Sequence, residues 1–264
     1  MTGPDRIVPL YSSSSGNSTL IKSNGAYILI DCGVSCKMTS QALIQSGVYP
    51  DDISAIFLTH RHTDHINGVK IFSKKYHTPI YATSATLAPL DELYSPVTAI
   101  DENDIVKLEK GPEVRAFPTP HDVPGSVCYR VINPENGNSI SIMTDLGRVT
   151  EGMKGFAKKS DVILLESNYD PYMLEHGPYP YPLKKRISGG HGHISNPECA
   201  QAAEFFIANG TRRFILGHLS PHNNTEEIAA ATFTEYLADK GLVKDEDYEL
   251  RVARKSEPTE GYVL

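Results

Sequence analysis

Three histidines and an aspartate fall within the short segment from Thr59 to His65. The segment follows an apolar run from Ile53 to Leu58, which predicts a buried strand. In open α/β sheets, the turn after such a strand lies at the edge where binding sites form. Imidazole nitrogen and carboxylate oxygen suit Zn²⁺, Mn²⁺ or Fe, so this density favours a metal site over a polar loop that merely faces solvent. The four candidate ligands are His60, His62, Asp64 and His65.

Other side chains able to bind metals or move protons follow further predicted strands. Each would be an unremarkable turn or surface residue if it stood alone. Because the carboxyl ends of neighbouring parallel strands meet at one edge of a sheet, their coincidence predicts a single site. These strand-end residues are Asp31, the cluster that begins at His60, His121, Asp145, Glu166 and His218.

The elements that must position these residues alternate between strands and helices, which predicts an α/β fold. Helices are expected at 38–46 and 68–76. Two more are expected to begin at capping residues, one at residue 195 that ends at 210 and one at residues 223–225 that ends at 241. The segment 87–108 is expected to combine turns, a short helix and a strand. Strands are expected at 7–10, 20–22, 27–30, 53–58, 80–82, 114–117, 127–131, 139–143, 162–165, 213–216 and 248–252.

Two segments have the composition of functional loops. Residues 169–190 are rich in proline, tyrosine and glycine, which predicts a lid or binding loop. Its tyrosines would either stack on nucleic-acid bases or pack the loop onto the body of the protein. The serine-rich stretch 11–18 predicts either an anion-binding turn or a plain hairpin. Its candidate phosphate-binding residues are Ser13, Ser14, Ser15 and Asn17.

Composition limits the class of protein. The length of 264 residues suits a single domain, 1–264, and no apolar run is long enough to cross a membrane. The net charge of −7 argues mildly against polynucleotide substrates, although basic clusters at 158–159 and 184–186 would suit either a phosphate track or ordinary surface. The N-terminus lacks signal-peptide features, and four scattered cysteines are expected to be free thiols of a cytoplasmic protein.

The motif His60-x-His62-x-Asp64-His65 resembles the signature of the metallo-β-lactamase-fold hydrolases, and the likeness extends over nearly the whole chain. The resemblance implies an α/β fold, a four-layer αββα sandwich. It also implies two divalent transition-metal ions (Zn, Mn or Fe) and a hydroxide between them as the nucleophile. In this family pattern Asp31 orients the ligand loop. The implied ligands are His60, His62 and His121 for the first ion, Asp64, His65 and His218 for the second, and Asp145 between them.

Glu166 and His193 bear on the substrate class. Lactamases of this fold have no bridging aspartate, so Asp145 argues against them, whereas glyoxalase-type thioesterases share the whole ligand set. The nuclease branch, which includes the tRNA 3′-end-processing enzymes, carries a glutamate and a histidine at these places. There the histidine, held by the glutamate, protonates the leaving oxygen, a contribution of typically ~10²–10⁴-fold. A histidine in a helix-entry turn is the alternative for His193. The implied catalytic residues are Asp64, Glu166 and His193.

Further motifs at 13–18, 192–196 and 217–224 look like those of the bacterial YycJ/WalJ group, which is linked to DNA exonuclease activity. We therefore expect a metal-dependent phosphodiesterase with a nucleic acid substrate, most simply a DNA exonuclease. RNA or a small nucleotide or cyclic phosphodiester is the alternative, and a thioester a more distant one. His191 and His222 are expected to be ordinary surface histidines.

Overall fold

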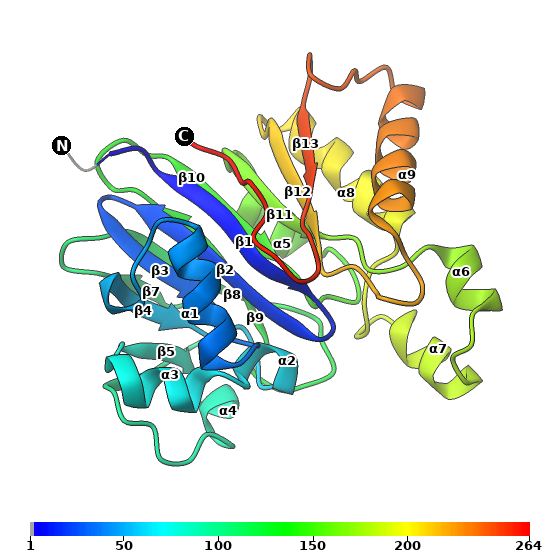
Figure 1. Ribbon diagram of the computed structural model, residues 1–264. Helices are drawn as coiled ribbons and strands as arrows, with labels where there is room; N and C mark the ends of the chain where they lie inside the picture. The colour runs from blue at the N-terminus through cyan, green and yellow to red at the C-terminus, as the bar shows by residue number, and fades with distance from the viewer. Residues whose placement is uncertain (1–2) are drawn as a thin grey trace.

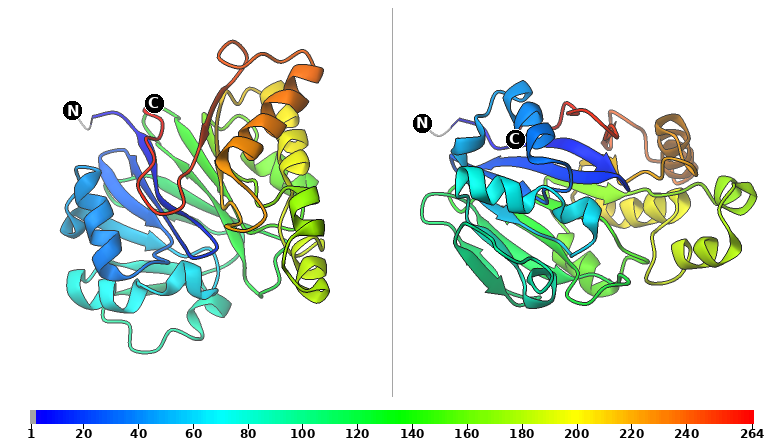
Figure 2. Two further views of the ribbon diagram at one scale, coloured as in Figure 1. Left: turned by 45° about the vertical axis from the view of Figure 1, so that its right-hand side comes forward. Right: turned by 60° about the horizontal axis from the view of Figure 1, so that its bottom comes forward.

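The computed structural model describes residues 3–264, which form two β-sheets lying face to face with helices outside each sheet (Figures 1 and 2). Apolar side chains from both sheets fill the space between them, among them Ile28 and Phe57 from one sheet and Tyr129 and Leu164 from the other. Burying each such side chain stabilises the fold by ~1.5–3 kcal/mol. This arrangement is the predicted four-layer αββα sandwich.

The first sheet is built from the N-terminal part of the chain, in the order β1-β2-β3-β4-β5-β6. Its first three strands form two antiparallel hairpins, and β3 to β6 then run parallel. The second hairpin turns at Asn24 and Gly25, which both have positive φ, as the Asn-Gly pair predicts. The strands are β1 (Arg6–Ser13), β2 (Gly16–Ser23), β3 (Ala26–Ile30), β4 (Ile53–Phe57), β5 (Ile80–Thr83) and β6 (Val97–Ile100).

The second sheet has the order β13-β12-β11-β10-β9-β8-β7. The strands β7 to β10 are antiparallel neighbours, and β10 to β13 run parallel. Parallel strands buried on both faces are expected to be apolar, as β11 is over residues 162–165 before its last residue, Glu166. The strands are β7 (Ile105–Lys107), β8 (Glu113–Pro118), β9 (Val127–Ile132), β10 (Ser139–Met143), β11 (Val162–Glu166), β12 (Arg213–Gly217) and β13 (Glu249–Val252).

Helices cover the outer face of each sheet. Side chains of α1 and α3 pack against the first sheet, while those of α5, α8 and α9 pack against the second. The α8 helix begins with the predicted capping box, in which Ser195 and Glu198 each accept from the other's backbone N–H. None of the helices described is long and apolar enough to cross a membrane. The bounds are α1 (Cys36–Gln45), α2 (Thr63–Ile66), α3 (Val69–Tyr76), α4 (Ser84–Leu87), α5 (Glu151–Ala157), α8 (Asn196–Ala208), α9 (Glu226–Asp239) and the 3₁₀ turn η1 (Pro50–Asp52).

Three local expectations need correction. Residues 169–190 are not an irregular loop but contain α6 (Pro171–His176) and α7 (Tyr181–Ile187), each short and started by a proline. Each helix is too short, and has too few apolar residues, for a helical period to be recognised in the sequence. The segment 87–108 contains two edge strands, β6 and β7, instead of one strand, and α5 was not expected at all. For the serine-rich stretch, the hairpin alternative agrees with the structure, since β1 and β2 pair across a turn at Ser14 and Ser15.

The four cysteines are free thiols, as predicted, and all four are buried. Burial raises the pKa of the Cys32 and Cys128 thiols to about 12, so both stay protonated. These cysteines therefore behave as small apolar core residues.

Candidate metal centre

The carboxyl ends of strands from both sheets meet at one edge of the sandwich and carry the predicted site residues. The first sheet supplies Asp31 after β3 and the His60 cluster after β4. The second sheet supplies His121 shortly after β8, Asp145 after β10, Glu166 at the end of β11 and His218 after β12. The structure thus brings together residues up to 187 positions apart in the chain. The site belongs to neither sheet alone.

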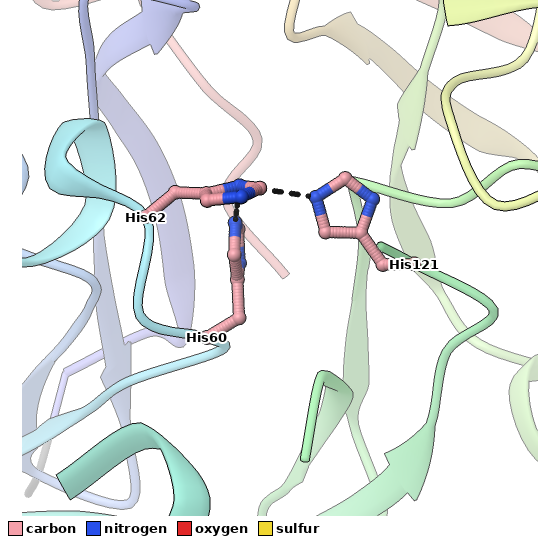
Figure 3. A group of neighbouring side chains, drawn as sticks. All are labelled: His60, His62 and His121. Atoms are coloured by element: carbon pink, nitrogen blue, oxygen red, sulfur yellow. Dashed lines mark hydrogen bonds between the residues drawn. The ribbon is translucent and has the colours of Figure 1, made fainter. Parts of the chain in front are cut away.

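His60, His62 and His121 form the first group of candidate ligands. Nδ1 of His62 lies 3.0 Å from Nε2 of His60 and 3.2 Å from Nε2 of His121, so three ring nitrogens converge on one point (Figure 3). Three histidines with nitrogens facing a common point are a set suited to Zn²⁺ and similar ions.

Asp64, His65 and His218 form the second group. The Nε2 atoms of His65 and His218 lie 3.5 Å and 3.9 Å from Oδ2 of Asp64. Asp145 lies between the groups, with Oδ2 3.2 Å from Nε2 of His65 and Oδ1 3.9 Å from Nε2 of His121. Its two oxygens therefore face ligands of different groups, as a carboxylate shared by two ions would require.

Each of the four buried histidines is held at Nδ1 and presents Nε2 to the centre. Nδ1 of His65 lies 2.7 Å from Oδ2 of Asp31, and Nδ1 of His218 lies 2.7 Å from Oε1 of Glu166. Nδ1 of His60 lies 3.0 Å from the Thr59 hydroxyl, and Nδ1 of His121 lies 3.3 Å from the Gly192 carbonyl. Such outer hydrogen bonds fix the tautomer and the orientation of metal-binding histidines.

Asp31 also holds the ligand loop itself. Its two carboxylate oxygens accept from the backbone N–H and the hydroxyl of Thr59, both at 2.8 Å. The loop then passes so close to Gly33 that a Cβ atom there would lie 1.7 Å from the carbonyl oxygen of Asp64. A glycine is therefore required at this position of the Asp31-x-Gly33 turn.

Three site residues have left-handed backbone conformations, with φ of 63° at Asp31, 57° at Asp145 and 56° at His218. Asp31 and His218 directly follow a strand and Asp145 lies two residues after one, where the sharp change of direction aims the side chain into the site. Such conformations are unfavourable for residues other than glycine, and they cluster at functional sites because the surrounding structure enforces them.

Two buried polar atoms of the centre lack a hydrogen-bond partner, Oδ2 of Asp145 and Nε2 of His218. Buried polar atoms without partners are rare, and each needs a physical explanation. Oδ2 of Asp145 faces His65 and Nε2 of His218 faces Asp64, so both atoms adjoin the second group. The donor set of imidazole nitrogens and carboxylate oxygens suits a divalent transition metal. The residues present therefore fit a bound metal.

The two groups differ in protonation when no metal is bound. Burial lowers the pKa values of His60, His62 and His121, most strongly that of His60, so this group is neutral near pH 7. Burial acts in the same direction on His65 and His218, but nearby carboxylates outweigh it. Asp145 and Asp31 raise the pKa of His65 well above its usual range, and Asp145, Asp64 and Glu166 raise that of His218 to about 10.

Metal binding is therefore expected to release protons from one group only. Neutral imidazole is the ligand form, so an ion at His65 and His218 must displace protons near pH 7, while an ion at His60, His62 and His121 need not. Affinity at the second group should rise with pH toward the His218 value of about 10. Calorimetric titration of metal-free protein with Zn²⁺, repeated in buffers of different protonation enthalpy, measures this. Equal proton release for both ions would contradict the expectation.

His193 and Glu166 lie beside the ligands. Nδ1 of His193 lies 2.9 Å from Oε1 of Glu166, which leaves Nε2 as the ring nitrogen available to a substrate. His193 lines a cavity of about 360 Å³ together with Asp64, Asp145 and His218. Glu166 is fully buried and also accepts from the backbone N–H groups of Leu146 and Ile194. It therefore supports both His193 and the candidate ligand His218.

The serine-rich turn lies at the edge of the site. Asn17 is directed at the candidate ligands, since its Nδ2 donates to Oδ2 of Asp64 at 3.2 Å and lies 3.0 Å from Nε2 of His65. Ser14 lines the cavity, whereas the Ser13 hydroxyl accepts from the backbone N–H of Ser15 within the turn. The side chains of Asn17 and Ser13 thus have partners within the protein, while Ser14 faces the cavity.

Several residues that contact the candidate ligands are not among the site residues predicted from the sequence. The Ser12 hydroxyl accepts from the backbone N–H of His218 at 2.8 Å, and Asn168 donates to the His218 carbonyl at the same distance. Asp122 has Oδ1 3.3 Å from Nε2 of His62, and its Oδ2 accepts from Nε of Arg186 at 2.6 Å. Asp122 follows His121 directly, and that adjacency is the one hint that could have found it.

Comparisons with known proteins agree with this geometry. Residues 26–219 match the family described as "Beta-lactamase superfamily domain". The exodeoxyribonuclease YycJ of Bacillus anthracis is 32% identical over 255 residues, 95% of this chain and 96% of that protein. The exodeoxyribonuclease WalJ of Streptococcus pneumoniae is 32% identical over 247 residues, 91% of each. The metallo-beta-lactamase fold protein YhfI of Bacillus subtilis has a TM-score of 0.72 at 16% identity, over 97% of this chain and 100% of that one.

Proposed function

Since the chain belongs to the beta-lactamase superfamily and to its YycJ/WalJ group, and is therefore a metal-dependent hydrolase, we propose that it is an exodeoxyribonuclease. The names of its relatives and the arrangement of His193 and Glu166 beside the candidate ligands support this assignment. The whole chain, 1–264, would act as a single hydrolase domain. Its four free cysteines suit the cytoplasm, where thiols stay reduced and DNA is found.

In this proposal the two groups described above would hold two divalent ions, Zn, Mn or Fe. His60, His62 and His121 would hold the first, Asp64, His65 and His218 would hold the second, and Asp145 would be shared by both. When bound, two such ions supply an ionised water as nucleophile near neutral pH and offset the charge of the phosphate. Asp31 and Glu166 keep the ligand histidines in the orientation and tautomer that binding needs.

In the proposed reaction, His193 protonates the leaving group. As the bond from phosphorus to the leaving oxygen breaks, Nε2 of His193 donates its proton to that oxygen and a free hydroxyl departs. Glu166 accepts from Nδ1 at 2.9 Å and holds the ring in place. An alkoxide is a poor leaving group without a proton, so a phosphodiesterase needs this residue where a thioesterase does not. The Glu166–His193 pair at the cavity is the observation that carries the proposal.

A panel of substrates tests the reaction class. We expect purified, metal-loaded protein to degrade end-labelled DNA and to hydrolyse bis-p-nitrophenyl phosphate, with little activity on a thioester. Faster hydrolysis of RNA or of a cyclic nucleotide than of DNA would show that DNA is not the preferred substrate, while the assignment as a phosphodiesterase would stand. Activity on the thioester alone would refute both.

A further inference from the structure

A second pocket lies beside the catalytic cavity and is not part of the metal centre. It has a volume of about 450 Å³ and lies between α6 and α7. Apolar and aromatic side chains make up the larger part of its walls, and two lysines, Glu175 and a serine line it as well. The lining residues that matter here are Tyr169, Leu174, Tyr181, Lys184, Lys185 and Ser188.

The α7 helix is the shared wall of the two hollows. Leu183, Arg186 and Ile187 line the catalytic cavity, while the residues between and around them line the second pocket. Figure 1 shows α6 and α7 together at one side of the molecule, away from the helices that cover the sheets. A helix with its side chains is only ~10–12 Å across. A polymer with one phosphodiester in the catalytic cavity can therefore place a neighbouring unit in the second pocket.

The charge of α7 fits a polyanion. Three consecutive basic residues, 184–186, lie on it in a chain whose net charge is −7. Arg186 is paired with Asp122, and Lys184 donates to the Glu175 carbonyl. Lys185 has no carboxylate partner within the described residues 3–264, and its Nζ lies 5.6 Å from the centre of the Tyr181 ring. The pocket thus has a free cation beside an aromatic face.

The aromatic lining fits a nucleobase. The Tyr181 side chain is 69% exposed, so its ring is accessible to a ligand that enters the pocket. Tyr169, by contrast, is buried at the base of the pocket, and burial raises its pKa to about 12. Aromatic side chains next to cations are how proteins bind unpaired bases, through stacking on the ring and contacts to the adjacent phosphate.

We propose that the pocket between α6 and α7 is a subsite for a nucleobase that flanks the scissile phosphodiester, with Lys184 and Lys185 on the neighbouring phosphate. The inference rests on the proposed function, because it takes the substrate to be a nucleic acid strand. A base in this pocket is out of its stack, so the strand that is cut is unpaired there.

Abasic substitution tests the base contact. DNA oligonucleotides with one abasic nucleotide, placed in turn at each position near the cleaved end, are compared by kcat/KM. In the wild-type protein we expect one flanking position at which loss of the base lowers kcat/KM by roughly 5- to 100-fold, the range of one stacking contact. In Tyr181→Leu the intact substrate should be slowed by a similar factor, and the abasic penalty at that position should disappear.

Matched variants keep the outcomes distinct. Tyr172→Leu removes a tyrosine that is also 69% exposed but lies outside the pocket, stacked on His176, and should retain the abasic penalty. The double variant Lys184→Gln/Lys185→Gln should raise KM for DNA. The control double variant Lys158→Gln/Lys159→Gln removes the same amount of charge and should leave KM for DNA unchanged. All four proteins should hydrolyse bis-p-nitrophenyl phosphate alike.

The results separate the two proposals. If wild-type protein hydrolyses the nitrophenyl ester but no DNA, the proposed function fails. If it degrades DNA but Tyr181→Leu keeps the full abasic penalty, or the two lysine pairs behave alike, the nucleobase subsite is refuted and the nuclease assignment stands.

Discussion

Replacing Asp145 by asparagine should leave at most one divalent ion per chain and lower phosphodiesterase activity by at least ~100-fold. This loss exceeds the ~10–100-fold that is typical when a residue that only orients a metal ligand is replaced. The carboxylate faces His65 with one oxygen and His121 with the other, and Oδ2 is buried without a hydrogen-bond partner. Asparagine keeps the size but has a single acceptor oxygen and no charge, so it cannot serve two cations. Elemental analysis of purified protein and a DNA assay measure the two effects.

Asparagine is chosen because it tolerates the left-handed backbone at this position, where φ is 57°. Alanine would add backbone strain to the loss of the carboxylate. Asp245→Asn is the matched control, since Asp245 has φ of 66° and lies on the surface. It should keep full metal content and activity. Two ions bound to Asp145→Asn would show that the carboxylate does not hold both.

Replacing His193 by alanine should slow hydrolysis of DNA by roughly 10²–10⁴-fold while both ions remain bound. The ring is not one of the proposed ligands, and its Nδ1 is already engaged by Glu166. The loss should be much smaller on bis-p-nitrophenyl phosphate, because nitrophenolate leaves without a proton. Metal content and kcat on the two substrates are the measurements.

His191→Ala is the control, because His191 lies two residues away in the same turn but is exposed. Equal losses on both substrates would mean that His193 positions the phosphate or the ions, and no loss on either would make it an ordinary turn residue. Glu166 is a poor target for this test. It also lies 2.7 Å from Nδ1 of His218, so its replacement disturbs a candidate ligand at the same time.

Much of the site could be predicted because its residues follow strong local patterns. The apolar runs before Asp31, His60, Asp145 and His218 predict strands, and the polar residue after each run marks the edge of the sheet. The motif at His60 then relates these separate strand ends to one another through the family it resembles. The layers of the sandwich follow from the same alternation of strands and helices.

The remaining contacts depend on tertiary geometry that no local pattern encodes. Ser12 and His218 are 206 positions apart, and only the tertiary fold, which also pairs Ser13 with Leu219, brings the Ser12 hydroxyl to the His218 backbone N–H. The pair of Asp122 and Arg186 depends on where α7 lies, and α7 itself is too short to show a period. Likewise, the resemblance to a known family predicts that Glu166 holds His193. The second contact of Glu166, with His218, could be found only from the three-dimensional structure.

Each candidate ion would take ligands from both sheets: His60 and His62 with His121, and Asp64 and His65 with His218. During synthesis the first sheet, which ends at Ile100, leaves the ribosome long before β12 and His218. A nascent or truncated chain that ends before residue 218 therefore lacks a ligand of the second ion, however well its first sheet has folded. If the proposed nuclease activity needs the second ion, a chain that ends before residue 218 would lack that activity, so synthesis must be almost complete before the enzyme can act.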